Sequence, residues 1–248
     1  MAGLQHGESA ELHAAKVIPP LAEGAPHTHA AEGTAADFLI REVHQYPGEV
    51  TVMGLGPLTN VALAVRLDDD FAGLAKEFVV MGAGLNPMAP TTDEFSLQYI
   101  YAPRSNFNWR WDPEAAKISL HAGWKRVVIV PTDATTETAF SQQMLDAITK
   151  ESSLAAKYIV AYPVLKLPMW DELTVAVWLR PTLVRHEDTM SLDVDTNPGA
   201  ASYGETQSWA PGKGPGLGEP VCEVVRAVDV SAFNAMFVEV MGRSVSGK

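Results

Sequence analysis

Amide and carboxylate side chains with useful spacing occur in two short segments of the sequence. Residues 105–108 read S-N-F-N and residues 170–173 read W-D-E-L. Amides two positions apart on an extended segment point the same way, so Asn106 and Asn108 can together hold neighbouring hydroxyl groups of a sugar. Asparagine also favours turns, and that second interpretation stays open for both residues.

Asp171 lies at the start of a predicted helix, residues 169–181, which is apolar on nearly all sides and ends at Pro181. We expect this helix to be buried. A carboxylate in its first turn either caps free backbone N–H groups or binds a cation or a polar substrate. Trp170 beside it is either a core residue or a surface on which a ring can stack.

The stretch V-T-V-M-G-L-G-P-L-T-N, residues 50–60, is similar to a phosphate-binding turn but lacks its defining residues. A dinucleotide fingerprint requires glycine where Asn60 stands, and a P-loop requires Gly-Lys-Ser/Thr. The remaining interpretation is a tight turn between a strand and a helix, with Pro57 in the first helical turn.

Short apolar strands alternate with helices around these segments. Strands are predicted at 50–53, 77–81 and 127–130, and helices at 34–46, 58–66 and 113–121. In the last of these helices, Asp112 is predicted to be the cap and Pro113 to lie in the first turn. This alternation indicates an α/β fold with a mostly parallel central sheet flanked by helices. Residues 1–33 are predicted to be an irregular lead-in, and residues 34–248 a single domain.

The remaining predictions concern two long loops and the last helix. Residues 83–111 and 195–220 are predicted to be irregular, and loops of that length are usually functional or disordered. The last helix is predicted to begin with Ser231 as its cap. Apolar residues recur along one of its faces and predict core packing: Phe233, Met236, Phe237, Val240 and Met241.

The composition argues against several kinds of partner. The 248 residues include 30 acidic and 18 basic side chains, for a net charge of -12, and no Lys/Arg cluster suited to nucleic acid. No apolar run approaches the length of a bilayer span and no targeting segment is recognisable, so the expected location is the cytoplasm. The single cysteine, Cys222, excludes an intramolecular disulfide. A homo-oligomer is compatible with the sequence.

Four segments together resemble the inosine-uridine type nucleoside hydrolase family. They follow the family's order and approximate spacing: G-P-L-T-N-V-A-L-A (56–64), F-V-V-M-G (78–82), F-N-W-R-W-D-P-E-A-A (107–116) and W-D-E-L-T-V-A (170–176). The resemblance covers about residues 34–240. It implies an α/β protein with a parallel-rich sheet that hydrolyses the N-glycosidic bond of ribonucleosides with a bound Ca²⁺.

The resemblance also implies roles for individual residues. The backbone carbonyl of Thr59 and the carboxylate of Asp171 would bind Ca²⁺. Asn106 and Asn108 would bind the ribose hydroxyl groups, and Met81 would line the sugar pocket. These roles follow from the family and not from the spacing of the residues alone.

The sequence departs from the family at three points. Asn106 stands where the family commonly has glutamate, and Trp170 where many members have a histidine near the leaving base; a tryptophan there can stack on a nucleobase. The third departure is the Asp-rich D-x-D-x-x-x-D-D segment of the first strand, which supplies the other calcium carboxylates and the catalytic base. It is not found here, so no catalytic residue is assigned.

The missing Asp-rich segment shapes the functional prediction. The acids at 68–70 and the stretch D-V-D-T-N-P-G-A at 193–200 are not expected to replace it. Calcium binding is therefore expected to be weak, and backbone groups near 50–54 are expected to lack a neighbouring strand. The predicted function is ribonucleoside hydrolysis, impaired by this loss. The alternative is a non-catalytic nucleoside-binding or interaction protein derived from the same fold.

Overall fold

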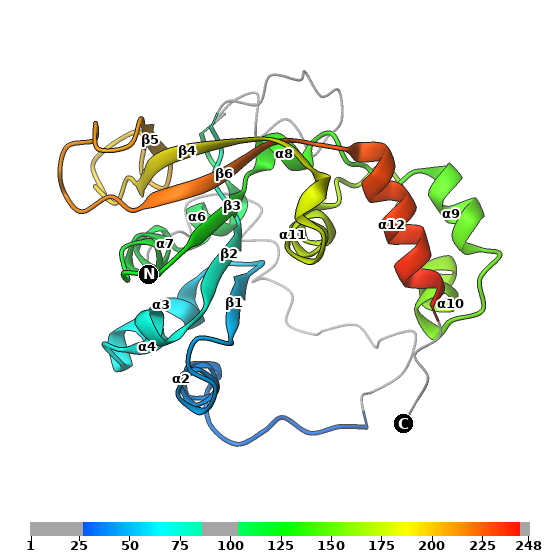
Figure 1. The fold of residues 1–248 in the computed structure, drawn as a ribbon, viewed down its shortest axis with the longest axis horizontal. Helices are drawn as coiled ribbons and strands as arrows, with labels where there is room; N and C mark the ends of the chain where they lie inside the picture. The colour runs from blue at the N-terminus through cyan, green and yellow to red at the C-terminus, as the bar shows by residue number, and fades with distance from the viewer. Residues whose placement is uncertain (1–26, 86–103, 244–248) are drawn as a thin grey trace.

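The fold is built on one six-stranded sheet. A computed structural model describes residues 27–85 and 104–243, and its strands lie in the order β1-β2-β3-β6-β4-β5 (Figure 1). Their bounds are Thr51–Gly54 for β1, Glu77–Met81 for β2, Val127–Val130 for β3, Val184–Val194 for β4, Thr206–Trp209 for β5 and Val221–Val228 for β6. Strands β1, β2, β3 and β6 pair in parallel, whereas β4 is antiparallel to β5 and β6. The predicted α/β fold with a mostly parallel sheet is confirmed.

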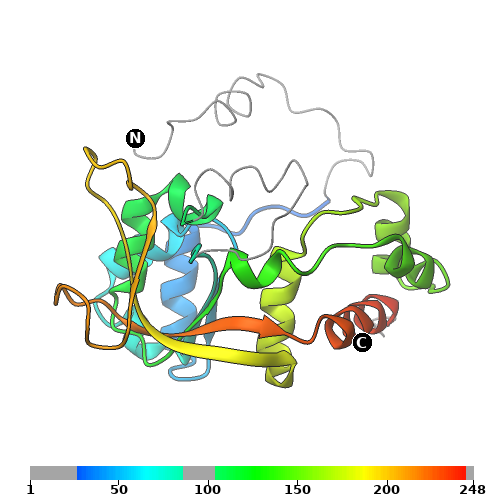
Figure 2. The ribbon, with the colours of Figure 1, turned by 90° about the horizontal axis from the view of Figure 1, so that it is seen from above.

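Helices cover both faces of the sheet (Figures 1 and 2). One layer contains α2 (Ala35–Gln45), α3 (Thr59–Leu67), α4 (Phe71–Leu74), α6 (Phe107–Trp111) and α7 (Pro113–Leu120). The other contains α8 (Thr132–Thr135), α9 (Gln142–Ile148), α10 (Leu154–Ala161), α11 (Trp170–Leu179) and α12 (Val230–Gly242), and the 3-10 helix Pro181–Leu183 connects α11 to β4. Strand β2 divides the two cores, because Phe78 and Val80 point into the first and Val79 into the second.

The central strands are apolar throughout because both of their faces are covered. Every residue of β2 and β3 is buried. Strands buried on both faces read as continuous apolar runs and not as alternating patterns. Both strands lie at their predicted positions, 77–81 and 127–130. By contrast, β1 pairs only with β2 among the described strands.

Two helix starts illustrate how side chains set the element bounds. Asp112 accepts a hydrogen bond from Ala115 N at 3.1 Å and caps α7, with Pro113 as the first helical residue, as the sequence predicts. The prediction for the last helix was wrong. Asp229 caps α12 by accepting a hydrogen bond from Ala232 N at 2.9 Å, so Ser231 lies inside the helix. Both Asp229 and Ser231 are good capping residues, and the helix simply begins one residue after the first of them.

The two predicted loops contain regular structure that the sequence reading missed. Helix α6 occupies the end of the predicted loop 83–111, and β5 lies within the predicted loop 195–220. A five-residue helix is too short for its hydrophobic period to be recognised, and β5 reads T-Q-S-W, which lacks the continuous apolar run that identified β3. Helix α11 is also less buried than expected, since Trp178 is 38% and Leu179 is 54% exposed. In the part of the chain that the structure describes, no helix is long and apolar enough to cross a membrane.

Glu77 is a buried carboxylate that joins three elements at the amino-terminal edge of the sheet. The residue is 5% exposed. It accepts hydrogen bonds from Thr51 Oγ1 at 2.9 Å, Arg126 Nη1 at 2.5 Å and Trp178 Nε1 at 3.1 Å. Burial raises the pKa of Glu77, but these hydrogen bonds outweigh burial and hold the pKa below its ordinary value. The carboxylate therefore fixes β1 and α11 against the start of β3.

We expect Glu77→Gln to lower the free energy of unfolding at neutral pH by about 1–3 kcal/mol, because a buried acceptor is replaced by a group with its own N–H donors. The lowered folded-state pKa means that this stability is present above the ordinary pKa of 4.5 and is lost as pH falls through the folded value. Urea unfolding of both proteins at neutral and acidic pH measures the difference. Glu223→Gln is the control, since Glu223 also pairs with Arg126 but is more exposed; an equal loss in the two variants would contradict the prediction.

Candidate active site at the carboxyl ends of the parallel strands

Three of the predicted site residues, Met81, Asn106 and Asn108, gather where β1 and β2 end. Met81 is the last residue of β2, Leu55 follows β1, and Thr132 lies two residues after β3. In open α/β sheets, ligands bind beyond the carboxyl ends of the strands. A cavity of about 600 Å³ at the opposite edge, lined by Glu77 and Arg126 among others, lies at the amino-terminal ends of β2 and β3. The residues predicted to contact a sugar, Met81, Asn106 and Asn108, lie instead at the carboxyl edge.

Asn108 joins the ends of β1 and β2 through its side chain. Its Nδ2 donates to Met81 O at 3.0 Å and reaches Leu55 O at 3.3 Å and Met81 Sδ at 3.4 Å. The residue is 7% exposed. Both N–H groups of the amide therefore face protein acceptors, and among the described residues no donor binds its Oδ1. That oxygen is the atom of Asn108 that is available to a ligand hydroxyl.

Asn106 is committed more fully to the protein. Its Oδ1 accepts a hydrogen bond from Trp109 N at 3.2 Å and so caps α6, while its Nδ2 donates to Thr132 Oγ1 at 2.8 Å. Asn106 therefore acts here as the cap of α6, a role that was not predicted for it from the sequence. Asn106 Nδ2 also lies 4.0 Å from Met81 Sδ, so both amides contact Met81. The spacing argument assumed an extended segment, whereas Asn108 lies inside helix α6. Their roles toward ribose stay predictions.

The backbone after β2 is shaped by a close contact with α6. A Cβ added to Gly82 would lie 2.1 Å from Trp109 Nε1, so the fully buried indole ring occupies the space that a side chain would need. Ala83, which is also buried, has a φ of 72°. A left-handed backbone at a non-glycine residue carries strain of about 1–3 kcal/mol and is found most often at functional sites.

Thr59 is the first residue of α3, and its side chain contacts the amide-bearing segment. Thr59 Oγ1 donates to Asp112 Oδ2 at 2.5 Å, which links residues 53 positions apart in the chain. The sequence assigned Asp112 only a capping role. The tight turn after Gly54 is therefore held at its far end by Asp112, the residue that caps α7. Calcium binding by the Thr59 carbonyl stays a prediction.

Trp170 and Asp171 begin α11, which packs against β2 and α8. The capping interpretation of Asp171 is wrong, because α11 has no side-chain cap hydrogen bond. Burial against neighbouring groups, followed by the charge of Glu172, raises the pKa of Asp171 to about 6. A carboxylate that is partly desolvated and beside a second acid is a candidate for binding a cationic or developing positive charge.

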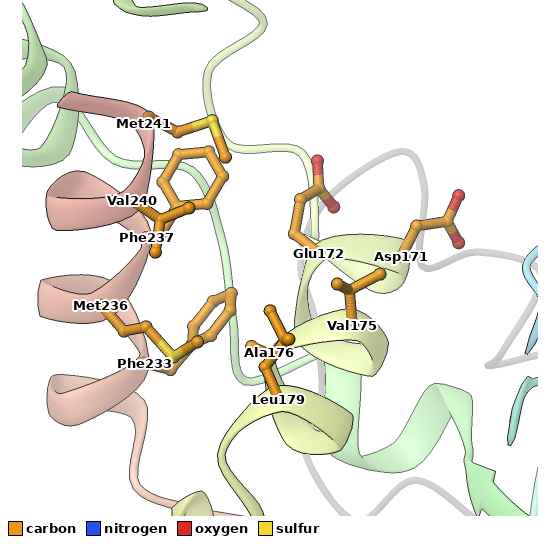
Figure 3. A pocket seen from close by; sticks show the side chains of 10 residues that line it. All are labelled: Asp171, Glu172, Val175, Ala176, Leu179, Phe233, Met236, Phe237, Val240 and Met241. Carbon is orange, nitrogen blue, oxygen red and sulfur yellow. The ribbon is translucent and has the colours of Figure 1, made fainter. Parts of the chain in front are cut away.

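The predicted core stripe of α12 is only partly buried. Phe233 and Met236 are buried, but with their apolar neighbours they also line a pocket of about 300 Å³ between α11 and α12 (Figure 3). Asp171 and Glu172 lie at the end of this pocket, and the carboxylate of Asp171 points away from α12. Apart from these two acids, the pocket is lined by apolar side chains.

Three of the acids that are not expected to replace the Asp-rich segment, Asp68, Asp193 and Asp195, have hydrogen-bond partners within the protein. Asp193 is buried and pairs with Lys117 Nζ at 2.5 Å and His121 Nε2 at 3.0 Å. Asp195 accepts a bond from the backbone N of Asn197 at 2.9 Å within a turn, and Asp68 pairs with His44. In residues 27–85 and 104–243, no group of three or more His, Cys, Asp or Glu side chains forms a metal site.

Two residues at this edge were not identified from the sequence. Thr132 Oγ1 accepts a hydrogen bond from Asn106 Nδ2, and Asp133 Oδ2 accepts one from Leu85 N at 2.9 Å. Both directly follow the buried strand V-V-I-V and its proline. The rule that ligands bind at the carboxyl ends of parallel strands was the signal that pointed to this position.

The fold and this edge define an α/β protein with two buried amides, Asn106 and Asn108, at the ends of its parallel strands. A family model described as inosine-uridine preferring nucleoside hydrolase matches residues 3–235, and the chain belongs to this family. The match begins inside the segment predicted to be an irregular lead-in, of which residues 27–33 contain no helix or strand. The family suggested by the four sequence segments is confirmed.

Curated relatives and solved structures agree on the family. Uridine nucleosidase 1 of Arabidopsis thaliana is 37% identical over 128 residues, which are 52% of this chain and 33% of the relative. Probable uridine nucleosidase 1 of Oryza sativa subsp. japonica is 33% identical over 54% of this chain and 38% of the relative. A plant nucleoside hydrolase structure, the PpNRh1 enzyme, has a TM-score of 0.72 at 23% identity and covers 88% of this chain and 69% of its own. The matched part of the chain thus spans between a third and two fifths of these two relatives.

The raised pKa of Asp171 leads to a prediction about stability. We expect Asp171→Asn to raise the free energy of unfolding at neutral pH by about 1 kcal/mol, because it removes a charge that burial disfavours. The gain is small because Asp171 reaches the surface, where solvent screens its charge. The folded pKa of about 6 lies above the ordinary 3.8, so ionisation weakens the fold as pH rises between these values. The gain should be complete at neutral pH and absent in acid below the ordinary pKa.

Denaturant unfolding of wild type and Asp171→Asn across this pH range is the measurement. Asp146→Asn, an exposed aspartate on α9, makes the same change in net charge and serves as the control. A gain of equal size in both variants, or a gain that persists in acid, would show that net charge and not the environment of Asp171 is responsible.

Proposed function

We propose that this chain hydrolyses the N-glycosidic bond of ribonucleosides to give ribose and a free base. The observation that carries the proposal is the convergence of Met81, Asn106 and Asn108 beyond the ends of β1 and β2, in a chain of the nucleoside hydrolase family. The names of the relatives, uridine nucleosidase and purine-preferring ribonucleoside hydrolase among them, support a nucleoside as substrate.

The side chains at the strand ends suit the sugar. Asn108 is held by the carbonyls of Leu55 and Met81, so its Oδ1 has a fixed direction and can accept a hydrogen bond from a ribose hydroxyl. The Met81 side chain, in contact with both amides, offers an apolar wall against the ring. The ordering of these groups before substrate arrives lowers the entropy lost on binding.

Departure of the base builds positive charge on the ribose, and Asp171 is the carboxylate of the proposed site that can stabilise it. Its pKa of about 6 leaves it ionised at neutral pH. A negative charge in a partly desolvated position stabilises a developing cation more strongly than the same charge in bulk water. Trp170, adjacent in the chain, offers an aromatic face on which the leaving base can stack.

Nucleoside hydrolases are generally metal-dependent, and the residues described here only partly suit Ca²⁺. Calcium takes six to eight oxygen ligands, and the proposed donors are one carboxylate, Asp171, and one carbonyl, Thr59. The described residues contain no cluster of three acidic or imidazole groups that would complete the set. We therefore propose weak calcium binding and assign no step of the reaction to the ion.

The test is an assay of ribose release from inosine and uridine by the full chain, with added calcium and with a chelator. We expect slow hydrolysis, and Asp171→Asn should lower kcat at least tenfold because it removes the charge that stabilises the ribosyl cation. Asp146→Asn, with the same change in net charge, should retain wild-type turnover.

Two other outcomes are informative. A nucleoside that binds but is never cleaved, with or without calcium, would contradict hydrolysis and favour the non-catalytic alternative. Rapid, calcium-dependent turnover would support hydrolysis but contradict the weak calcium binding proposed here.

A further inference from the structure

The segment that carries the two amides holds the turn after β1 at two points. Near the start of α6, Asn108 Nδ2 reaches Leu55 O at 3.3 Å. Immediately after α6, Asp112 Oδ2 accepts the 2.5 Å hydrogen bond from Thr59 Oγ1. Leu55 and Thr59 are the two ends of the turn between β1 and α3, so these contacts fix the whole turn against α6.

Asp112 is itself held on a well-anchored helix. Its other oxygen, Oδ1, accepts the hydrogen bond from Ala115 N and caps α7. Helix α7 packs along α3 and is tied to β4 by the ion pair of Lys117 with the buried carboxylate of Asp193, which also contacts the ring of His121 at the end of α7. A side chain on such a support holds its partner more precisely than one on a loop.

Helix capping alone does not account for both oxygens of Asp112. A cap needs one acceptor, and serine provides it as well as aspartate does. The second oxygen of Asp112 is used for Thr59, in a short hydrogen bond to an ionised acceptor, which is the stronger type. What aspartate adds over serine at this position is therefore the contact with the turn.

We propose that Asp112 is a positioning residue of the active site that acts through Thr59. It keeps the turn at residues 55–59 aligned with Asn108 and Met81, and it does not itself contact the substrate. This inference rests on the proposed nucleoside hydrolysis. It concerns a residue for which the sequence indicated only a cap.

The test compares Asp112→Ser, which keeps the cap but cannot reach Thr59, with Thr59→Val, which keeps the branched shape but lacks the hydroxyl. We expect each variant to lower kcat/KM about tenfold, because small displacements of positioning groups have effects of this size or larger. The double variant should be no slower than the slower single variant, since both remove one interaction. Thr59→Ser, which restores the hydroxyl, should recover most of the activity lost in Thr59→Val.

A second readout does not depend on activity. Ala62 N donates to Leu58 O at 2.9 Å in the first turn of α3, and its amide hydrogen exchange should accelerate in Asp112→Ser and in Thr59→Val. Phe233 N, which donates to Asp229 O at 2.9 Å at the start of α12, is the internal reference and should exchange as in the wild type. Asp229→Ser, the same substitution at another helix cap, should leave kcat/KM unchanged.

The outcomes separate this inference from the proposed function. Wild-type turnover in Asp112→Ser and Thr59→Val, measured well below their melting temperatures, would overturn the positioning role while hydrolysis stands. Losses that multiply in the double variant would also overturn it. If the wild type cleaves no nucleoside, the proposed function fails, and unchanged exchange at Ala62 in both variants would then overturn the inference as well.

Discussion

The hydrogen bonds from one amide, that of Asn108, to the carbonyl oxygens at the ends of two parallel strands are the interaction on which the site depends. Parallel strands end at the same edge of a sheet, where their last carbonyl groups have no strand partner and need donors. Asn108 satisfies Met81 O and reaches Leu55 O. Helix α6 is fixed above β1 and β2 by this contact, and the positions of Asn106 and Asp112 on either side of it follow.

The rest of the fold separates stability from chemistry along the strands. The middle of β2 and β3 is apolar and lies between two helical layers, and Glu77 joins neighbouring elements at the amino-terminal edge. Locally unfavourable features lie toward the carboxyl edge. Ala83 has a left-handed backbone, and the surroundings of Asp171 disfavour its ionised form and raise its pKa. Functional sites commonly contain such locally unfavourable features, which the surrounding fold supports.

Sequence reasoning located the strands and helices that have a strong period and failed where the elements are short. β2, β3, α3 and α7 lie within a residue or so of their predicted bounds, because continuous apolar runs and the Asp112-Pro113 cap are strong local signals. The five residues of α6 were predicted to be loop because one helical turn has no measurable period. β5 was predicted to be loop because T-Q-S-W has no apolar run. Strands β4 and β6 were also missed, since their residues alternate unevenly between buried and exposed positions.

The candidate site shows the same division. The family resemblance named Met81, Asn106 and Asn108 as site residues, but the partners of each amide could not be predicted, because they come from Leu55, Thr132 and the backbone of α6 itself. Contacts between distant segments depend on how the elements pack. The bond between Thr59 and Asp112 is of this kind and has no local signature.

The contact between Gly82 and Trp109 has a consequence for how this chain tolerates sequence change. Even alanine at residue 82 would place a methyl group against the indole ring, and Trp109 has no room to move because it is completely buried. Trp109 directly follows Asn108 in α6, so a shift of the ring would carry the amide away from Met81. The Trp109 ring therefore leaves no volume for a side chain at residue 82, and this contact by itself disfavours any residue other than glycine there.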